Sequence, residues 1–445
     1  MPEITDESEP LVSTEWERDI PGPIWSWWLA GAKPDGAGLR RWQLWVWWER
    51  QRGAQKRLFA AVRFLRGFIE APLEAWGGVR RFGHKTKNVH GVSRSTQFRQ
   101  LLMLRWQFGV RPNSYYKFQL FKPERFSAAA DYLEEIGQLL QVVCRHSPRT
   151  ADERLFLSKE EFRRWCTANG IPTVENLIEV NRGEVVSRLT EQLPASDLFA
   201  KPTNWIQGKG TSRWQCVPSA HGHHYTDGSG LELSTTEFED FICRTSLEQG
   251  RPYIVQPALM NHETLRGYTN GSLATVRLMT VRGSGQSSKP LMAALRMPTG
   301  QAVADNFDLG GVAAPIDLNT GTCRPGIRKK GQLPPDTVNT HPDTGSVIAG
   351  LAIPYWSECL ALTCRAHDLI HAQVPVIGWD VAVLENGPIL IEPNYLPCHN
   401  LAQMPEGFPL GDSPFAEIVT MRLRKVFLTR SDSVNNEKAD GGLQS

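Results

Sequence analysis

The sequence predicts an α+β protein with a basic, helical region at its N-terminal end. Apolar residues recur at helical spacing over residues 58–69, with arginines between them. From residue 170 onward, short strand-like and helix-like segments alternate. Near the C-terminal end, residues 377–394 form two apolar strand-like runs joined by a Glu-Asn-Gly-Pro turn. These patterns predict a helical region followed by a mixed region of strands and helices.

The composition is that of a globular protein with two or three domains, each large enough to bury a core. Of 445 residues, 41% are hydrophobic and 22% are charged, and the net charge of +2 indicates no particular partner. Eight cysteines without a C-x-x-C pair are typical of reduced thiols in a cytosolic protein. Neither a signal peptide nor an apolar run of about 18 residues is visible, so we expect a cytoplasmic protein without a membrane-spanning helix.

The N-terminal region is basic and rich in tryptophan. Between residues 40 and 125 there are roughly 19 Lys or Arg against roughly 4 Asp or Glu. Such a region can pack against the main body of the protein, lie peripherally in a membrane interface, or bind an acidic partner or nucleic acid. The first outcome is the commonest, and nucleic acid is the least favoured. The tryptophans concerned are Trp25, Trp27, Trp28, Trp42, Trp45, Trp47, Trp48, Trp76 and Trp106.

The remaining elements follow from apolar runs and from helix and strand signals. A helix is expected to begin at Ser158-Lys159 and to end at Asn169-Gly170. Strands are expected at residues 198–202, 253–256, 273–281 and 291–297, and a long helix at residues 355–371. The polar tail after residue 431 is expected to be disordered. The predicted domains are the basic helical region, a helical segment, two α+β subdomains and the tail, at residues 1–125, 126–197, 198–265, 266–430 and 431–445.

The two C-terminal strands carry three side chains with oxygen atoms. Asp380 stands near the start of the first strand, and Glu392 and Asn394 close the second. In a hairpin, residues about a dozen apart can lie side by side, and residues two apart share a face. The three side chains could therefore meet at one spot, which would suit Mg²⁺. The alternative is a surface hairpin with ordinary solvated acids.

Two loops are candidates for binding a ligand through backbone groups. Lys201 ends a strand, and the loop after it closes on Gly208, Lys209 and Gly210. The lysine would supply charge, and the glycines would let N–H groups approach phosphate oxygens, although the Walker pattern G-x-x-x-x-G-K-[ST] is absent. Asn306, with a glycine pair shortly after it, could also bring the backbone close to a ligand. Ordinary turns are the alternative for both loops.

Three histidines form a further cluster, His221, His223 and His224. They lie in a glycine-rich loop, and no cysteine or carboxylate stands at ligand spacing, so zinc is not expected. The nucleophile motif G-x-S-x-G is also absent.

The order of these pieces, from Lys159 to Asn394, resembles the ATP-grasp superfamily. Four segments are most similar to its sugar-transfer-associated branch: Phe199-Ala200-Lys201-Pro202, Asp305-Asn306-Phe307, His341-Pro342-Asp343-Thr344-Gly345 and Gly378-Trp379-Asp380. The later motifs are also similar to those of peptide-tail glutamate ligases. The resemblance covers residues 147–400 and leaves the N-terminal region outside it.

The resemblance implies an ATP-grasp fold, in which two α+β subdomains grip ATP. Residues 198–265 would be the lid, and residues 266–430 would carry the metal site. Lys159 and Lys201 would contact phosphates, and residues 203–210 would fold over them. The strand at residues 253–256 would hold adenine. Gln256 stands where many relatives carry an acidic residue, which alters the contacts to ribose or adenine because Gln can also donate hydrogen bonds.

The resemblance also implies the catalytic residues and the metal ligands. Arg277 and Arg296 would face the transferred phosphoryl group, with Asn306 as a third catalytic candidate. Asp380, Glu392 and Asn394 would bind two Mg²⁺ ions.

The implied activity is that of an ATP-dependent ligase joining a carboxylate to an amine or thiol. Phosphorylation by ATP would give an acyl phosphate for the nucleophile to attack, while Mg²⁺ and cationic side chains neutralise the developing charge. ATP and Mg²⁺ are the expected cofactors, and a role in polysaccharide or cell-surface modification is expected. The alternatives are a phosphotransferase on the same fold and a protein that binds ATP without turnover.

Overall fold

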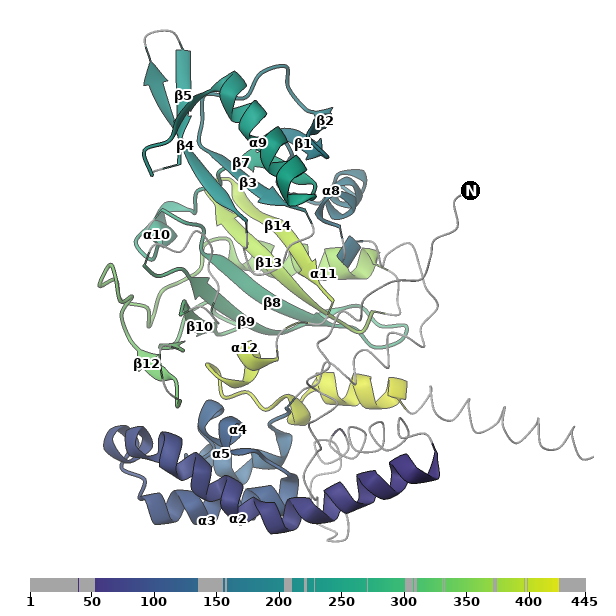
Figure 1. Ribbon diagram of the computed structural model, residues 1–445, viewed down its shortest axis with the longest axis vertical. Coiled ribbons are helices and arrows are strands. Elements are labelled where there is room, and N and C mark those ends of the chain that lie inside the picture. The colour runs from purple at the N-terminus through teal and green to yellow at the C-terminus, as the bar shows by residue number, and fades with distance from the viewer. Residues whose placement is uncertain are drawn as a thin grey trace, which may run out of the picture. The chain divides into compact units, whose positions relative to one another are not determined.

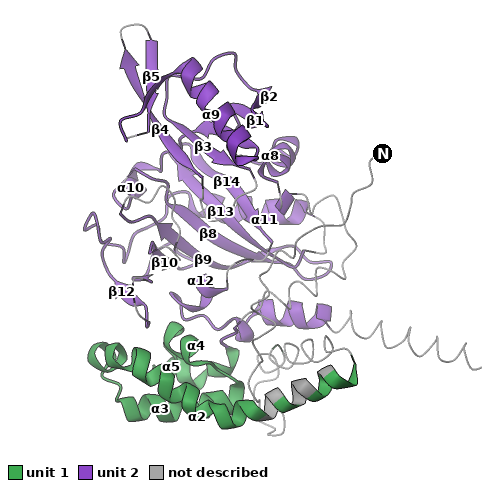
Figure 2. Cartoon of the chain, in the orientation of Figure 1, with its two compact units in different colours: residues 1–131 green, residues 132–445 purple. Residues whose placement is uncertain are grey.

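The chain divides into two units, residues 1–131 and residues 132–445 (Figure 2). The computed structural model describes residues 39, 53–134, 155–156, 158–203, 210–219, 222–227, 229–269, 271–300, 307, 310–329, 331, 333–370, 374–395, 397 and 399–423. The predictions for Trp25 to Trp48, residues 204–209, His221, Asn306 and the tail after residue 431 lie outside the described residues.

The described elements of the first unit are helical. They are α2 (Ala54–His90), α3 (Arg94–Phe108), α4 (Pro112–Lys117), α5 (Pro123–Ser127) and the 3₁₀ helix η3 (Ala129–Asp131). Gly91 ends α2 with a φ of 71°, which residues with a side chain rarely adopt. Ser93 then caps α3, because its Oγ accepts a hydrogen bond from the Thr96 backbone N–H at 3.1 Å. As a result α3 packs back against α2 (Figure 1).

The core of the first unit contains tyrosines, while its two described tryptophans lie at the surface. Tyr115 and Tyr116 are fully buried, and the Tyr116 hydroxyl donates to Gln97 Oε1 at 2.8 Å. Trp76 is 63% exposed and Trp106 is 36% exposed. These two tryptophans are therefore not part of the core of the first unit.

The second unit contains two antiparallel sheets, one after the other along the chain. Among the described residues, the first has the strand order β2-β1-β7-β3-β4-β5-β6. α9 (Thr235–Gln249) packs against this sheet (Figure 1). Phe238 of α9 contacts Trp214 and Tyr225 in the core. The strands are β1 (Ile178–Asn181), β2 (Glu184–Arg188), β3 (Leu198–Pro202), β4 (Ser212–Ser219), β5 (Gly222–Thr226), β6 (Glu232–Ser234) and β7 (Tyr253–Pro257).

The second sheet has the order β12-β11-β10-β9-β8-β13-β14 among the described residues. α11 (Trp356–Leu369) packs against β8, β9, β13 and β14, and α8 (Lys159–Ala168) joins the same apolar core through Phe162 and Cys166. The strands are β8 (Thr275–Val281), β9 (Lys289–Met297), β10 (Val312–Ile316), β11 (Gly326–Arg328), β12 (Asp336–Val338), β13 (Val376–Leu384) and β14 (Gly387–Asn394). The short helices are α10 (Glu263–Arg266), α12 (Asn400–Gln403) and η5 (Leu410–Asp412), and residues 414–423 are also helical.

The β13–β14 hairpin contains a β-bulge. Asp380 pairs with Glu392, but the next residue, Val381, pairs with Leu390, so Ile391 has no partner across the ladder. Val381 and Leu390 are fully buried in the apolar core. Asp380 and Glu392 therefore lie on the opposite face of the sheet from that core, because successive residues of a strand alternate.

The α+β fold class predicted from the sequence is confirmed, and most element ends lie close to the predicted ones. The Ser158 hydroxyl accepts from the Glu161 backbone N–H, so α8 begins at Lys159 as expected. α11 begins at Trp356 rather than Tyr355, because Tyr355 adopts a left-handed backbone with a φ of 53°. In the part of the chain that the structure describes, no helix is both long and apolar enough to cross a membrane.

Candidate functional site

The β13–β14 hairpin brings the three predicted metal ligands together. Asp380 lies opposite Glu392, and Gly378 lies opposite Asn394, so all three side chains project from one face. The approach depends on Gly378: a Cβ there would stand 2.7 Å from the Pro397 Cβ and 3.6 Å from the Asn394 Cβ. Only glycine fits this position without displacing Pro397.

Two arginines from neighbouring strands bond to Asp380. Arg277 on β8 lies directly opposite it, with its Nε 2.5 Å from Asp380 Oδ1. Arg296 on β9 reaches Asp380 Oδ2 at 2.9 Å and also donates to Thr275 Oγ1 at 2.6 Å. Strands β9, β8 and β13 are neighbours in this order (Figure 1). This order places both predicted catalytic arginines on one predicted metal ligand.

The two carboxylates differ in their affinity for protons. Burial acts to raise the pKa of Asp380, but the charges of Arg277 and Arg296 outweigh it and the pKa falls below its usual value. Burial, followed by the negative charge of Asp380, raises the pKa of Glu392, and nearby lysines oppose this rise only in part. Asp380 is therefore the fixed negative charge of the site, and Glu392 is the carboxylate that forms no ion pair with another described residue.

Two lysines face Glu392 from other elements. Lys201 projects from β3 of the first sheet, and Lys159 is the first residue of α8. Burial, helped by the positive charge of Lys159 and opposed by that of Glu392, lowers the pKa of Lys201 to about 8. The Lys159 Nζ donates to the backbone oxygen of Thr203 at 3.4 Å. Lys159 and Lys201 are two positive charges close together in a buried place, and they repel each other. An anionic ligand between them is therefore favoured.

The donor set fits a hard divalent cation. Two carboxylates and one side-chain amide offer oxygen atoms, which Mg²⁺ prefers. The amide of Asn394 is not committed elsewhere: its Nδ2 is buried and has no hydrogen-bond partner among the described residues. Asp380, Glu392 and Asn394 are thus the residues that would hold Mg²⁺.

Comparison with protein families matches residues 146–413 to the family described as sugar-transfer-associated ATP-grasp. The chain belongs to the sugar-transfer-associated ATP-grasp family. The matched range contains every residue of the site described above, and it confirms the resemblance predicted from the motifs. Membership of this family supports an ATP-dependent ligase in general.

Solved structures with a similar fold include three ligases or synthases. D-alanine–D-alanine ligase from Coxiella burnetii is 13% identical with a TM-score of 0.32, over 64% of this chain and 62% of that one. The same enzyme from Helicobacter pylori is 13% identical with a TM-score of 0.34, over 63% and 64%. N5-carboxyaminoimidazole synthase from Aspergillus clavatus is 12% identical with a TM-score of 0.29, over 60% and 54%. The aligned part spans less than two thirds of each of those chains, and no curated protein matches this sequence significantly.

A polar network that the sequence did not predict fixes α8 of this ATP-grasp protein. The Gln256 amide donates to Asn176 Oδ1 at 2.8 Å, and the Asn176 amide donates to Glu160 at 2.7 Å and Glu179 at 3.1 Å. Glu160 follows Lys159 directly, so the network sets the position of that lysine relative to β1 and β7. The adjacency of Glu160 to Lys159 is the only sequence signal that could have indicated it.

Three predicted site residues, Gly208, Lys209 and Asn306, lie outside the described residues. Gly210, where the description resumes after the loop, has a φ of 67°. Its backbone oxygen accepts from the Tyr253 hydroxyl at 3.3 Å, which ties the end of the loop to β7.

The histidine cluster makes ordinary contacts in its described part. The His223 ring lies 3.0 Å from the Tyr225 hydroxyl, and His224 lies 3.5 Å from Glu232. No group of three or more His, Cys, Asp or Glu side chains arranged for a metal occurs within the described ranges. The site of this ATP-grasp protein is not such a group, because it combines two carboxylates with an amide.

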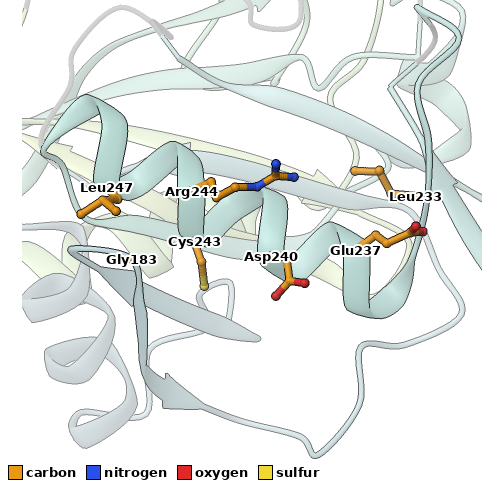
Figure 3. A pocket seen from close by; sticks show the side chains of 7 residues that line it. All are labelled: Gly183, Leu233, Glu237, Asp240, Cys243, Arg244 and Leu247. Atoms are coloured by element: carbon orange, nitrogen blue, oxygen red, sulfur yellow. The ribbon is translucent and has the colours of Figure 1, made fainter.

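A separate hollow of about 530 Å³ lies on α9 and contains none of the predicted site residues (Figure 3). Glu237, Asp240 and Cys243 project along one side of the helix. Burial raises the pKa of the Cys243 thiol, and the charges of Asp240 and Glu239 add to the rise. The thiol is therefore a poor nucleophile, and the hollow does not coincide with the chemistry of the site.

Proposed function

We propose that the protein is an ATP-dependent ligase that joins a carboxylate to an amine or a thiol through an acyl phosphate. The observation that carries this proposal is the meeting of two carboxylates with two arginines and two lysines at the β13–β14 hairpin. The cations come from β3, β8, β9 and α8. Family membership supports the same class of reaction.

The chemistry explains why such a site needs so many cations. A carboxylate resists attack because its leaving group would be oxide, and phosphorylation gives it a good leaving group. The phosphoryl group in transfer carries charge on its oxygens, so positioned cations accelerate the step. Mg²⁺, when bound, would neutralise phosphate charge and orient the phosphates for in-line transfer.

Each side chain then has a separate task. Lys159 and Lys201 hold the phosphates of ATP from the side of the first sheet. Arg277 and Arg296 present guanidinium groups to the phosphoryl group as it moves to the substrate carboxylate. No protein side chain forms a covalent bond to the substrate.

The proposal is tested by incubating the full chain with ATP, Mg²⁺ and pools of acids and nucleophiles. The acceptor pool includes amino acids, peptides and amino sugars, because the family description mentions sugar transfer. The acid carries heavy oxygen in its carboxylate. An acyl phosphate requires that one heavy oxygen appears in the released phosphate, together with a ligated product seen by mass spectrometry.

Other results would contradict the proposal. A phosphorylated acceptor with no heavy oxygen in phosphate would identify a phosphotransferase. ATP that remains unconsumed with every pool, while still binding, would identify a protein that holds ATP without turnover.

A further inference from the structure

One face of α2 in the first unit carries a row of exposed apolar side chains. Ile69 is 78% exposed and Leu73 is 73% exposed, and Trp76 is exposed beside them. Leu58 and Val62 are exposed as well. The spacing of these residues, by four, seven, four and three, places them in one line along the helix.

This apolar row is separate from the face of α2 that packs within the unit. The buried residues Ala71, Ala75, Val79 and Phe82 lie on the side that contacts α3 and α4. The row spans 19 residues of helix, from Leu58 to Trp76, a rise of about 27 Å. α2 thus has two apolar faces, and only one of them is used by the described part of the unit.

Basic side chains accompany the row. Arg80 and Lys87 continue its line toward the end of α2, and Arg66 lies beside it. All three are exposed. The helix contains eight Lys or Arg and only two acidic residues. Both acidic residues are neutralised: Glu70 pairs with Arg66 at 2.6 Å, and Glu74 pairs with Arg105 of α3 at 2.7 Å.

We propose that this face of α2 docks on an anionic lipid surface, with the helix lying in the plane of the interface. The apolar row would enter the boundary between headgroups and acyl chains, and the arginines would meet the lipid phosphates. Trp76, within the row, is the type of side chain that favours this boundary. The proposal does not depend on the proposed enzymatic function.

Other kinds of partner would make favourable contacts with only some of the side chains on this face of α2. Nucleic acid would attract the arginines but would leave the apolar row in water, since its outer surface is phosphate. A second copy of the chain would cover the apolar row but would bring two strongly basic helices together. An anionic interface takes up both the apolar and the basic side chains.

The test is flotation of the full chain with vesicles. Two compositions are compared, phosphatidylcholine alone and phosphatidylcholine mixed with phosphatidylglycerol. We expect the protein to float with the mixed vesicles, and to float less as salt is raised, because salt screens the attraction. Absence of flotation with the mixed vesicles would overturn the proposal.

Variants locate the surface. Ile69→Asp combined with Leu73→Asp should weaken partitioning by about tenfold or more, since two apolar side chains no longer enter the interface. Arg80→Gln should weaken it by about fivefold. The matched control is Leu247→Asp on α9, a helical leucine that is 62% exposed in the other unit, and it should float as the wild type does.

Circular dichroism must show that each variant remains folded. If the double aspartate variant does not fold, the test rests on Arg80→Gln. Flotation unchanged in both α2 variants would overturn the proposal. So would loss of flotation in Leu247→Asp alone. Binding to duplex DNA that competes with vesicles and is insensitive to Ile69→Asp and Leu73→Asp would favour nucleic acid instead. A dimer that these substitutions convert to a monomer, with no flotation, would identify a second copy as the partner.

Discussion

The second unit contains two pairs of neighbouring acidic side chains, Glu160 with Glu179 and Asp380 with Glu392. The pKa values shift in the same way in both pairs. In each pair one pKa is lowered and the other is raised. Burial acts to raise the pKa of Glu160, but hydrogen bonds from Arg163 and other neighbours outweigh it, while burial and the Glu160 carboxyl raise the pKa of Glu179. Proximity of two acids therefore does not by itself mark a ligand site.

The two pairs differ in how many hydrogen bonds the rest of the protein makes to their carboxylates. Glu160 accepts hydrogen bonds from Arg163, Arg164 and Asn176, and Asn176 also bonds to Glu179. At the hairpin, Asp380 is held by two arginines, but no hydrogen bond joins Glu392 to another described residue. The comparison teaches that unused hydrogen-bonding capacity, rather than acidity, distinguishes the candidate site from a structural network.

The largest effect is expected from removing a buried cation. Arg277→Met should lower the free energy of unfolding by about 3–5 kcal/mol, because Asp380 then loses one of its two partners while it stays buried. Arg163→Met, in the other network, should cost about 1 kcal/mol or less, since Arg163 is partly exposed and Arg164 still bonds to Glu160. Urea unfolding of both variants measures the difference, and equal losses would remove the distinction between the two regions.

The next effect concerns turnover. Glu392→Gln should lower product formation about a hundredfold or more, because the site loses one charge that would hold Mg²⁺. Glu179→Gln is the matched control and should keep most activity, since Glu179 bonds to Asn176 and is not among the residues that would hold Mg²⁺. Full activity of Glu392→Gln at ordinary Mg²⁺ concentration would sink the metal assignment.

The pH dependence of stability at Lys201 gives a further test of the candidate site. Its pKa is about 8 in the folded state against 10.5 as its ordinary value. Between these values the folded protein binds fewer protons than the unfolded one, so stability rises with pH across this window. Lys201→Met should therefore stabilise the protein at pH 7 by about 1–3 kcal/mol while weakening ATP binding.

The stabilisation in Lys201→Met should shrink as pH rises from 8 to 10.5, because the wild-type lysine is then neutral in the folded state and no longer places a charge in a buried position. Lys289→Met, which removes an exposed lysine of β9, is the matched control. Thermal unfolding at several pH values measures both variants. A Lys201→Met variant that is less stable than the wild type at pH 7 would show that this lysine is satisfied in the folded protein.

The smallest effect is expected at Gly378. Gly378→Ala should cost about 1–2 kcal/mol, because the added methyl group would stand 2.7 Å from Pro397 and force it to move. The same shift should disturb Asn394, whose Cβ would lie 3.6 Å away. Activity should therefore fall more than stability alone explains, and comparing both with Gly77→Ala in α2, where a Cβ meets nothing within 4 Å, tests this.

The hairpin could be predicted from the sequence because its signals are local. The alternation of side chains and the Glu-Asn-Gly-Pro turn together set Asp380 near Glu392. The bonds from Arg277 and Arg296 to Asp380 could not be predicted, because they depend on the strand order β9-β8-β13. The network of Gln256 and Asn176 joins residues 80 positions apart and contains no motif.

The N-terminal helix shows a different limit of sequence reasoning. The apolar spacing of residues 58–69 predicted a helix, and α2 includes them. The same spacing fits a helix packed in a core and a helix lying on a membrane, so it could not say which face is covered. Only the exposure of side chains such as Ile69 and Trp76 separates the two apolar faces.

The bulge at Ile391 has a consequence for how insertions and deletions would act on this fold. In a regular strand Leu390 and Glu392 would point the same way, and the unpaired residue between them is what sends the leucine inward and the carboxylate outward. Deleting Ile391 would make Leu390 and Glu392 neighbours in a regular ladder, so the leucine would still face the core and the carboxylate would still face away from it. The bulge therefore lets β14 hold one residue more than β13 over this stretch without changing which side chains face the site.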